Sequence, residues 1–229
     1  METTHIPLID VVRLSEKRCR QPIRAELKYA TAENFIGRPI AGYALEAKDI
    51  CLMGPKAAHA MCDAQNWLVE KYNYSLIIYD AYRPLRAVQD FAQWFHQPSA
   101  GPHEMARAKL HYPHLTKDRL PELGYVAPKV SRHCFGNAVD VCLIDLATES
   151  PLDMGAIYDY FDDISHTTAT ANQIGEAALR HREILAQAML QVGFEAYKNE
   201  YWHFNFYEYE VDEPLDVPIT TALKGVGVK

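Results

Sequence analysis

The spacing of apolar residues predicts several amphipathic helices along this chain. Apolar positions that recur every three or four residues predict helices over 55–72, 84–98, 103–110 and 172–192. The first is the clearest, because Pro55 suits an opening helical turn and apolar residues recur from Ala57 to Leu68. Gly193 follows the last helix, where glycine commonly ends helices. The stretch 97–130 is otherwise irregular, since it holds five prolines and shows little periodicity.

Strands are predicted between these helices. Short apolar runs and alternating patterns predict strands over 8–14, 75–79, 138–145, 194–197 and 202–207. The last two form a predicted antiparallel hairpin with its turn at or near 198–200. Residues 154–161 hold an aromatic cluster in a predicted loop or turn. Strands and helices in this order favour an α+β fold, in which a mainly antiparallel sheet is flanked by helices.

Composition and charge limit the classes of partner. The 229 residues are 48% hydrophobic and 23% charged, as in a globular protein with a substantial core, and no linker divides them. One domain over 1–229 is therefore predicted, with 208–229 as a peripheral C-terminal tail. The net charge of −7 and the lack of basic clusters argue against nucleic acid or an anionic membrane as partner. No apolar run approaches the roughly 18 residues of a membrane-spanning helix.

Cysteine usage and the first residues favour a cytoplasmic location. The five cysteines are odd in number and show no CxxC spacing, so free thiols are expected rather than disulfides or a thiolate zinc site. Residues 1–7 lack the basic-then-apolar order of a secretory signal.

Two short stretches carry side chains that suit a metal. Residues 131–140 place His133 and Asp140 seven positions apart, and Glu200 and His203 lie close together near the C-terminus. Two histidines, one aspartate and a spare glutamate match a catalytic zinc site, which has three protein ligands, an open position and a general base. One zinc ion per chain is the predicted cofactor. The alternative is that these residues are structural and scattered through the core.

Such a site requires the chain to bend in both stretches. Seven residues of straight strand would hold His133 and Asp140 about 20 Å apart, so a tight bend is expected at Gly136, where glycine accepts a positive φ. A hairpin turn at 198–201 would let Glu200 lean over the metal while the following histidine binds it from the strand.

Four further residues are candidates with competing interpretations. Arg83 lies at a predicted junction between a strand and a helix, where it could stabilise a substrate oxyanion or simply pair with Asp80. Tyr29 lies in a loop suited to substrate contacts but also matches an ordinary half-buried aromatic residue. His111 fits a solvated loop, and His181 an apolar helical face, better than a metal site.

In these residues the sequence resembles the D-alanyl-D-alanine dipeptidases, the VanX-like branch of the hedgehog/DD-peptidase zinc superfamily. The matching motifs are Ser-x-His-x-x-Gly-x-Ala-x-Asp at 131–140 and Glu-x-Trp-His at 200–203. Further matching segments, spread over most of the chain, lie at 28–31, 80–84, 154–155, 159, 165–166 and 193–197.

The resemblance implies a catalytic zinc site whose protein ligands are His133, Asp140 and His203. In that arrangement Glu200 is the general base and Arg83 stabilises the transition state. The resemblance also implies an α+β fold that carries the metal on an antiparallel sheet.

By the same resemblance, Tyr29, Ser131 and Asp159 bind the substrate backbone, with Asp159 opposite the free α-amino group. The sequence departs from the family beside the first metal ligand, where Cys134 and Phe135 replace a polar and basic pair. This departure predicts a more apolar cleft wall next to the metal.

The function implied by the resemblance is zinc-dependent hydrolysis of the D-alanyl-D-alanine dipeptide to two D-alanines by metal-activated water. Its partner would be a small dipeptide. Two alternatives stay open: a D,D-carboxypeptidase or murein endopeptidase acting on longer peptidoglycan peptides, and a non-catalytic zinc-binding protein. An enzyme of this kind could serve antibiotic resistance, cell-wall recycling or scavenging of D-amino acids.

Overall fold

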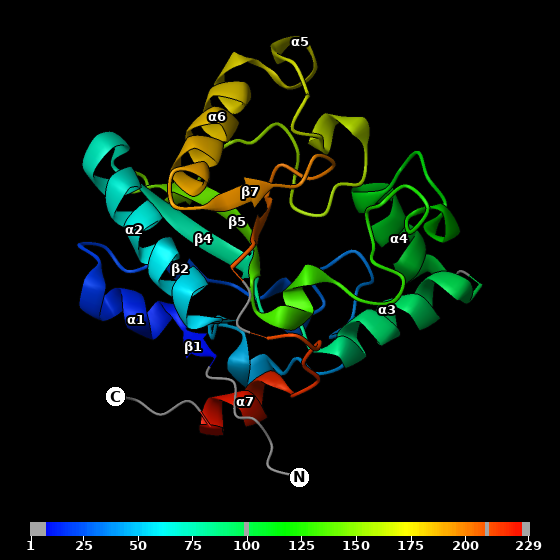
Figure 1. Ribbon diagram of the computed structural model, residues 1–229. Coiled ribbons are helices and arrows are strands. Elements are labelled where there is room, and N and C mark those ends of the chain that lie inside the picture. The colour runs from blue at the N-terminus through cyan, green and yellow to red at the C-terminus, as the bar shows by residue number, and fades with distance from the viewer. Residues whose placement is uncertain (1–7, 99–100, 209–210, 226–229) are drawn as a thin grey trace.

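A six-stranded mixed sheet lies at the centre of the computed structural model, which describes residues 8–98, 101–208 and 211–225 (Figure 1). Its strands are β2 (Arg24–Ala25), β4 (Tyr74–Asp80), β5 (Ala138–Asp145), β6 (Ser150–Pro151), β7 (Phe194–Ala196) and β8 (His203–Phe206). Their order is β2-β4-β5-β8-β7, with β6 also paired to β5; β2 and β4 are parallel, and every other pair is antiparallel. A separate antiparallel pair joins β1 (Ile9–Asp10) to β3 (Leu52–Met53). The predicted mainly antiparallel sheet is confirmed.

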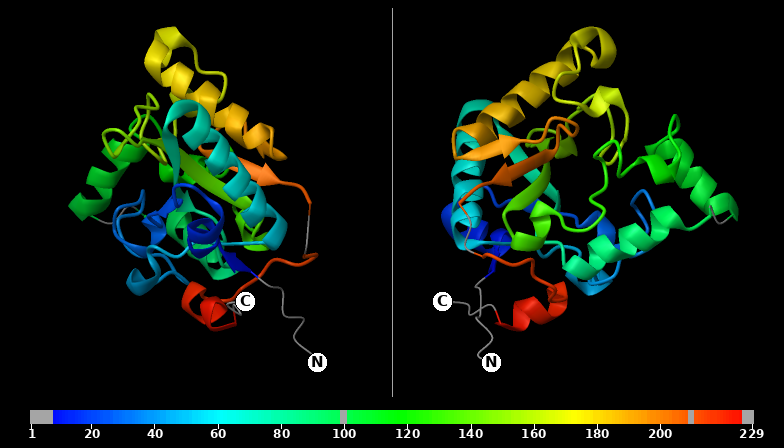
Figure 2. Two further views of the ribbon diagram at one scale, coloured as in Figure 1. Left: turned by 90° about the vertical axis from the view of Figure 1, so that its left-hand side faces the viewer. Right: turned by 45° about the vertical axis from the view of Figure 1, so that its right-hand side comes forward.

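Helices lie on both sides of this sheet. They are α1 (Val11–Arg18), α2 (Pro55–Tyr72), α3 (Leu85–His96), α4 (Gly101–His111), α5 (Ala171–Ile174), α6 (Glu176–Leu190) and α7 (Ile219–Gly225). Figure 2 shows α2 and α6 together on one side and α3 and α4 on the other. β5 accordingly has no exposed face: its residues from Ala138 to Ile144 are all buried, Asp140 included.

The strongest sequence patterns gave the right elements. The predicted helix over 55–72 is α2, with Pro55 in its first turn and Asn73 closing it in the left-handed conformation at φ 57°. The predicted helix over 84–98 is α3, and the short one over 103–110 is α4. The strands expected over 75–79 and 138–145 are β4 and β5.

The strand predicted over 8–14 is largely wrong. Only Ile9 and Asp10 are extended, and the helix α1 begins at Val11. The Asp10 side chain accepts hydrogen bonds from the main-chain N–H groups of Val12 and Arg13, which caps the helix. An aspartate within an apolar run thus starts a helix instead of continuing a strand.

The long helix predicted over 172–192 is divided in two. Gly175, at φ 87°, separates α5 from α6. His181 does not lie in the core as expected: it is half-buried, and its Nδ1 lies 2.7 Å from the Asp153 carbonyl oxygen. The neighbouring Arg182 is buried instead, with its guanidinium 4.1 Å above the Tyr201 ring.

The segment after β8 is attached more closely than the expected peripheral tail. Within its described part, Val211 and Ile219 are buried. The main chain of Leu215 donates to the Cys134 carbonyl and accepts from the Leu85 N–H, at 2.9 and 3.0 Å. The tail therefore links the start of α3 to the turn that carries His133.

Three further sequence expectations concern the cysteines, membrane-spanning helices and the first residues of the chain. All five cysteines are free thiols, and all except the half-buried Cys19 are buried, as expected. No helix in the described ranges has the length and apolar character needed to cross a membrane. Residues 1–7, for which no secretory signal was expected, lie outside the described part of the chain.

Candidate active site

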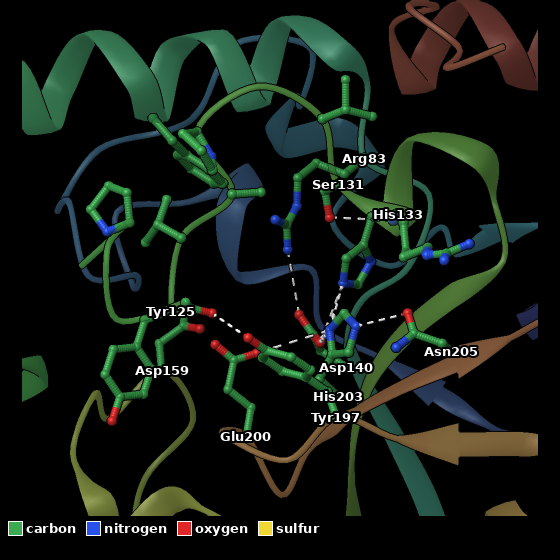
Figure 3. Close-up of a pocket in the computed structure, with 18 of the residues that line it drawn as sticks. Arg83, Tyr125, Ser131, His133, Asp140, Asp159, Tyr197, Glu200, His203 and Asn205 are labelled. Carbon is green, nitrogen blue, oxygen red and sulfur yellow. Dashed lines mark hydrogen bonds and ion pairs between the residues drawn. The ribbon is translucent and has the colours of Figure 1, made fainter.

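Two aspartates and one histidine lie in a row across three neighbouring strands. Asp80, the last residue of β4, pairs with Asp140 in β5, and Asp140 pairs with His203, the first residue of β8. A register shift after Ile78 brings Asp80 opposite Asp140. The strand pairing thus gathers residues that are far apart in the sequence, and Figure 3 shows His203 beside Asp140.

His133 joins this row from a short 3-10 turn, η4 (Arg132–Phe135), that precedes β5. The Ser131 side chain accepts from the His133 N–H at 3.4 Å and caps the turn, and Gly136 ends it at φ 69°. The expected bend at Gly136 is therefore present. The His133 Nδ1 lies 2.6 Å from the Ala81 carbonyl oxygen; because a carbonyl can only accept, Nδ1 carries the proton and Nε2 has a lone pair.

Adding a methyl group at Gly136 should destabilise the fold. A Cβ there would lie 2.7 Å from Leu8 Cδ2. Gly136→Ala should cost about 1–2 kcal/mol for the left-handed backbone and roughly 1–3 kcal/mol more for the overlap, measured by denaturant unfolding. Gly193→Ala is the control: φ is 94°, but the nearest contact, with Phe206, is an ordinary 3.4 Å. Equal losses in the two variants would contradict the predicted overlap.

Three potential metal ligands converge at the centre of the site. His203 Nδ1 lies 3.1 Å from His133 Nε2 and 3.0 Å from Asp140 Oδ1, and His133 Nε2 lies 3.4 Å from the same oxygen. His133, Asp140 and His203 are the one group of this kind found in the described ranges. Burial alone would raise the pKa of Asp140, but the two histidines lower it below its ordinary value. The donor set fits a divalent cation of the kind that nitrogen and oxygen ligands hold.

The position of Arg83 fits both interpretations of its role, as an ion-pair partner of Asp80 and as a cation in the cavity. Its Nε donates to Asp80 Oδ2 at 2.8 Å, so the expected ion pair exists. Its Nη2 also lies 3.5 Å from Asp140 Oδ2, and the side chain lines the cavity above the three ligands. The guanidinium packs 5.1 Å from the centre of the Tyr29 ring. Arg83 is thus a buried, fixed cation beside the metal position.

Glu200 lies in the turn between β7 and β8, close to the ligands without belonging to them. Its Oε2 is 3.9 Å from His203 Nδ1, and only 7% of the residue is exposed. Burial, followed by the charges of Asp140 and Asp159, raises the pKa of Glu200 well above its usual value. A carboxyl group with a raised pKa next to a metal position can act as a general base or acid.

Tyr29 and Asp159, two of the predicted substrate-binding residues, line the cavity together, and Figure 3 shows Asp159 across from His133. The Tyr29 hydroxyl donates to Asp159 Oδ2 at 3.0 Å, and both residues are buried. Asp159 has a φ of 57°, and burial followed by the charge of Asp140 raises its pKa well above the usual value. Tyr29 is therefore not an ordinary half-buried aromatic residue.

Two residues around Asp159 were missed or misplaced by sequence reasoning. Tyr158 donates to Asp140 Oδ2 at 2.9 Å, whereas the sequence indicated only an aromatic loop. His111 was expected in a solvated loop but is buried at the end of α4, with Nδ1 3.0 Å from the Asp159 carbonyl oxygen. Burial lowers the pKa of His111 to about 4, so it is a neutral support for the Asp159 backbone.

The predicted site residues open into one cavity of about 430 Å³, which Tyr158 and His111 do not line. Every predicted site residue lines it: Tyr29, Arg83, Ser131, His133, Asp140, Asp159, Glu200 and His203. Its apolar wall comes from the following residues: Phe35, Phe91, Pro121, Val126, Ala127, Pro128 and Val130. The irregular stretch 97–130 therefore contributes to the site, which its composition did not indicate.

The expected effect of Cys134 and Phe135 on the cleft wall is wrong. Cys134 is fully buried and Phe135 is half-buried, and neither lines the cavity. Ser131, Arg132 and His133 line it instead, because the 3-10 turn directs the next two side chains elsewhere.

Comparison with known proteins finds both a matching family and similar individual proteins. The D-ala-D-ala dipeptidase family model matches residues 16–219. The chain belongs to this family. The family match bears out the resemblance seen in the sequence motifs.

Individual members of the D-ala-D-ala dipeptidase family match over most of their length. A D-alanyl-D-alanine dipeptidase of Enterococcus faecalis is 35% identical over 193 residues, 84% of this chain and 88% of the relative. The protein of the same name from Enterococcus faecium is 36% identical, over 80% of this chain and 85% of the relative. That of Streptomyces coelicolor is 36% identical, over 86% of this chain and 93% of the relative.

Proposed function

We propose that this protein is a zinc-dependent dipeptidase that hydrolyses D-alanyl-D-alanine to two D-alanines. The observation that carries the proposal is the buried Glu200 beside the three-ligand group, with Arg83 in the same cavity. A site that only held a metal would need neither a base nor a cation beside it. The names of the relatives support the choice of substrate.

His133, Asp140 and His203 would hold the zinc ion, through two nitrogens and one oxygen. When bound, zinc lowers the pKa of a coordinated water towards 7 and polarises the scissile carbonyl. Glu200 takes a proton from the attacking water and delivers it to the leaving amine. Arg83 donates hydrogen bonds to the carbonyl oxygen as negative charge develops on it.

The Asp159 carboxylate binds the α-amino group of the substrate. The Tyr29 hydroxyl donates to Asp159 Oδ2 and so holds that carboxylate in place. Ser131 lines the cavity beside His133 and contacts the substrate backbone. Binding of an ammonium group offsets the burial and the Asp140 charge that raise the pKa of Asp159, so the ionised carboxylate is favoured in the complex.

Blocking the amino group should therefore abolish efficient cleavage. Acetylation of D-Ala-D-Ala removes the positive charge that Asp159 recognises, and kcat/KM should fall about 10–100-fold or more, since a hydrogen bond to a charged group contributes about 1.5–3 kcal/mol. Asp159→Asn should lower kcat/KM for the free dipeptide by a similar factor, measured by D-alanine release. Faster cleavage of the acetylated form would instead establish the carboxypeptidase alternative.

Asp163→Asn is the matched control for that experiment. It removes the same charge from a side chain that is 87% exposed and does not line the cavity. Its kcat/KM for both substrates should equal that of the unmodified protein. A fall equal to that of Asp159→Asn would assign the effect to net charge instead of recognition.

We also propose a single hedgehog/DD-peptidase-like domain over 1–229, acting in the cytoplasm on free dipeptide. Segments from both ends of the chain contribute to one sheet and one hydrophobic core, which supports a single domain. Five free thiols suit a reducing compartment. Because the proposed substrate is D-alanyl-D-alanine, we also propose roles in antibiotic resistance and in cell-wall metabolism.

A further inference from the structure

Asn205 lies behind His203, on the side away from the metal position. The two residues are two positions apart in β8, so their side chains emerge on the same face of the strand. Asn205 Oδ1 lies 3.0 Å from His203 Nε2, and the asparagine is 7% exposed. Figure 3 shows this contact between the two side chains. The Asn205 backbone pairs with Ala138 in β5 and with Glu195 in β7, so it is fixed from both sides.

This contact selects one tautomer of the His203 imidazole. The amide oxygen of Asn205 can only accept, so the proton of neutral His203 must lie on Nε2. The lone pair is then on Nδ1, which faces His133 Nε2 and Asp140 Oδ1. With the amide reversed, its NH₂ group would face Nε2 and place the proton on Nδ1, pointing at the metal position.

The imidazole of His133 is held in the same way, but its two ring nitrogens have exchanged roles. His133 donates from Nδ1 to the Ala81 carbonyl and presents Nε2 to the centre. A main-chain oxygen thus fixes one imidazole, and a side-chain oxygen fixes the other. Only the second can be removed by substitution.

We infer that Asn205 is a positioning residue, which holds His203 as the Nε2–H tautomer with Nδ1 presented to the metal. The inference rests on the metal site of the proposed function and adds a residue to it. Acceptors behind metal-bound histidines orient the ring and raise ligand basicity, and their loss commonly weakens metal binding 10–100-fold.

Zinc affinity, measured by competition with a chromogenic chelator, tests this role without relying on turnover. Asn205→Leu keeps a similar side-chain size and removes the acceptor, so zinc should bind about 10–100-fold more weakly. Asn205→Asp keeps an acceptor for the Nε2–H group and should bind zinc within a few-fold of the unmodified protein. Should the leucine variant fail to fold, Asn205→Ala serves in its place.

Asn137→Ala is the matched control. Asn137 is also a buried asparagine at the same sheet, just before β5, yet neither of its amide atoms has a partner among the described residues. It does not line the cavity, and its replacement should leave zinc affinity unchanged.

Nitrogen NMR of the zinc-loaded protein gives an independent readout, because it shows which ring nitrogen of His203 carries the proton. A proton on Nε2 is expected, and a proton on Nδ1 would overturn the inference. Equal zinc affinity in Asn205→Leu, or failure of Asn205→Asp to restore it, would also overturn the inference. Failure of the unmodified protein to bind zinc or to hydrolyse the dipeptide would instead refute the proposed function.

Discussion

Replacing Glu200 with Gln should lower kcat about 10²–10⁴-fold, the usual contribution of a general base, while zinc stays bound. Glutamine keeps the size of the side chain but cannot take a proton from water. Glu200 is not one of the three converging ligands, and its Oε2 lies 3.9 Å from His203 Nδ1, so the metal should remain. The measurement is kcat for D-Ala-D-Ala together with the zinc content of the purified variant.

Glu195→Gln is the control for this substitution. Glu195 belongs to the same hairpin, but its side chain is exposed and does not line the cavity. This variant should keep both zinc and activity. Activity near the unmodified level in Glu200→Gln would show that another group accepts the proton. Loss of zinc in that variant would show that Glu200 is a ligand.

Sequence periodicity identified the elements in which one strong local signal decides the outcome. α2 has a proline at its start and a regular apolar face, β4 contains a continuous apolar run, and β5 is apolar except for Asp140 and its last residue. The failures occur where a single residue overrides the pattern. Asp10 caps α1 inside an apolar run, and Gly175, with its positive φ, divides a helix whose periodicity continues on both sides.

The site residues were found because their chemistry is concentrated in two short motifs, and the family resemblance supplied the others. The support around them depends on strand register, which the sequence does not display. Asp80 meets Asp140 only after a register shift, and Tyr158 reaches Asp140 from a loop without periodicity. Asn205 had a local signal, since side chains two positions apart share a strand face, but its partner atom depends on the ring orientation of His203.

For Cys134 and Phe135 the prediction was wrong for another reason. It gave too much weight to a difference from the family sequence next to a metal ligand. In the 3-10 turn only Arg132 and His133 face the cavity, so the substituted positions lie outside it. Differences in substrate preference are therefore expected from the apolar wall that includes Phe35 and Val126.

Replacing Arg83 with Met should lower kcat about 10²–10³-fold, the usual effect of removing one donor from a developing oxyanion. The guanidinium is buried, held by Asp80, and directed at the cavity above the metal ligands. Arg83→Lys should recover only part of the loss, because an ammonium group keeps the charge without the planar fork of donors. Both variants are assayed for kcat, zinc content and thermal unfolding.

A loss of stability could imitate this result, since Asp80 is fully buried and would lose its cation. Breaking a buried ion pair costs about 3–5 kcal/mol, whereas removing both charges is often neutral. The double variant Asp80→Asn with Arg83→Met should therefore recover stability, because Tyr43 can still donate to the asparagine oxygen that replaces Asp80 Oδ1. Its kcat should remain as low as that of Arg83→Met. If turnover returned together with stability, Arg83 would be a structural partner of Asp80 and would have no part in stabilising the transition state.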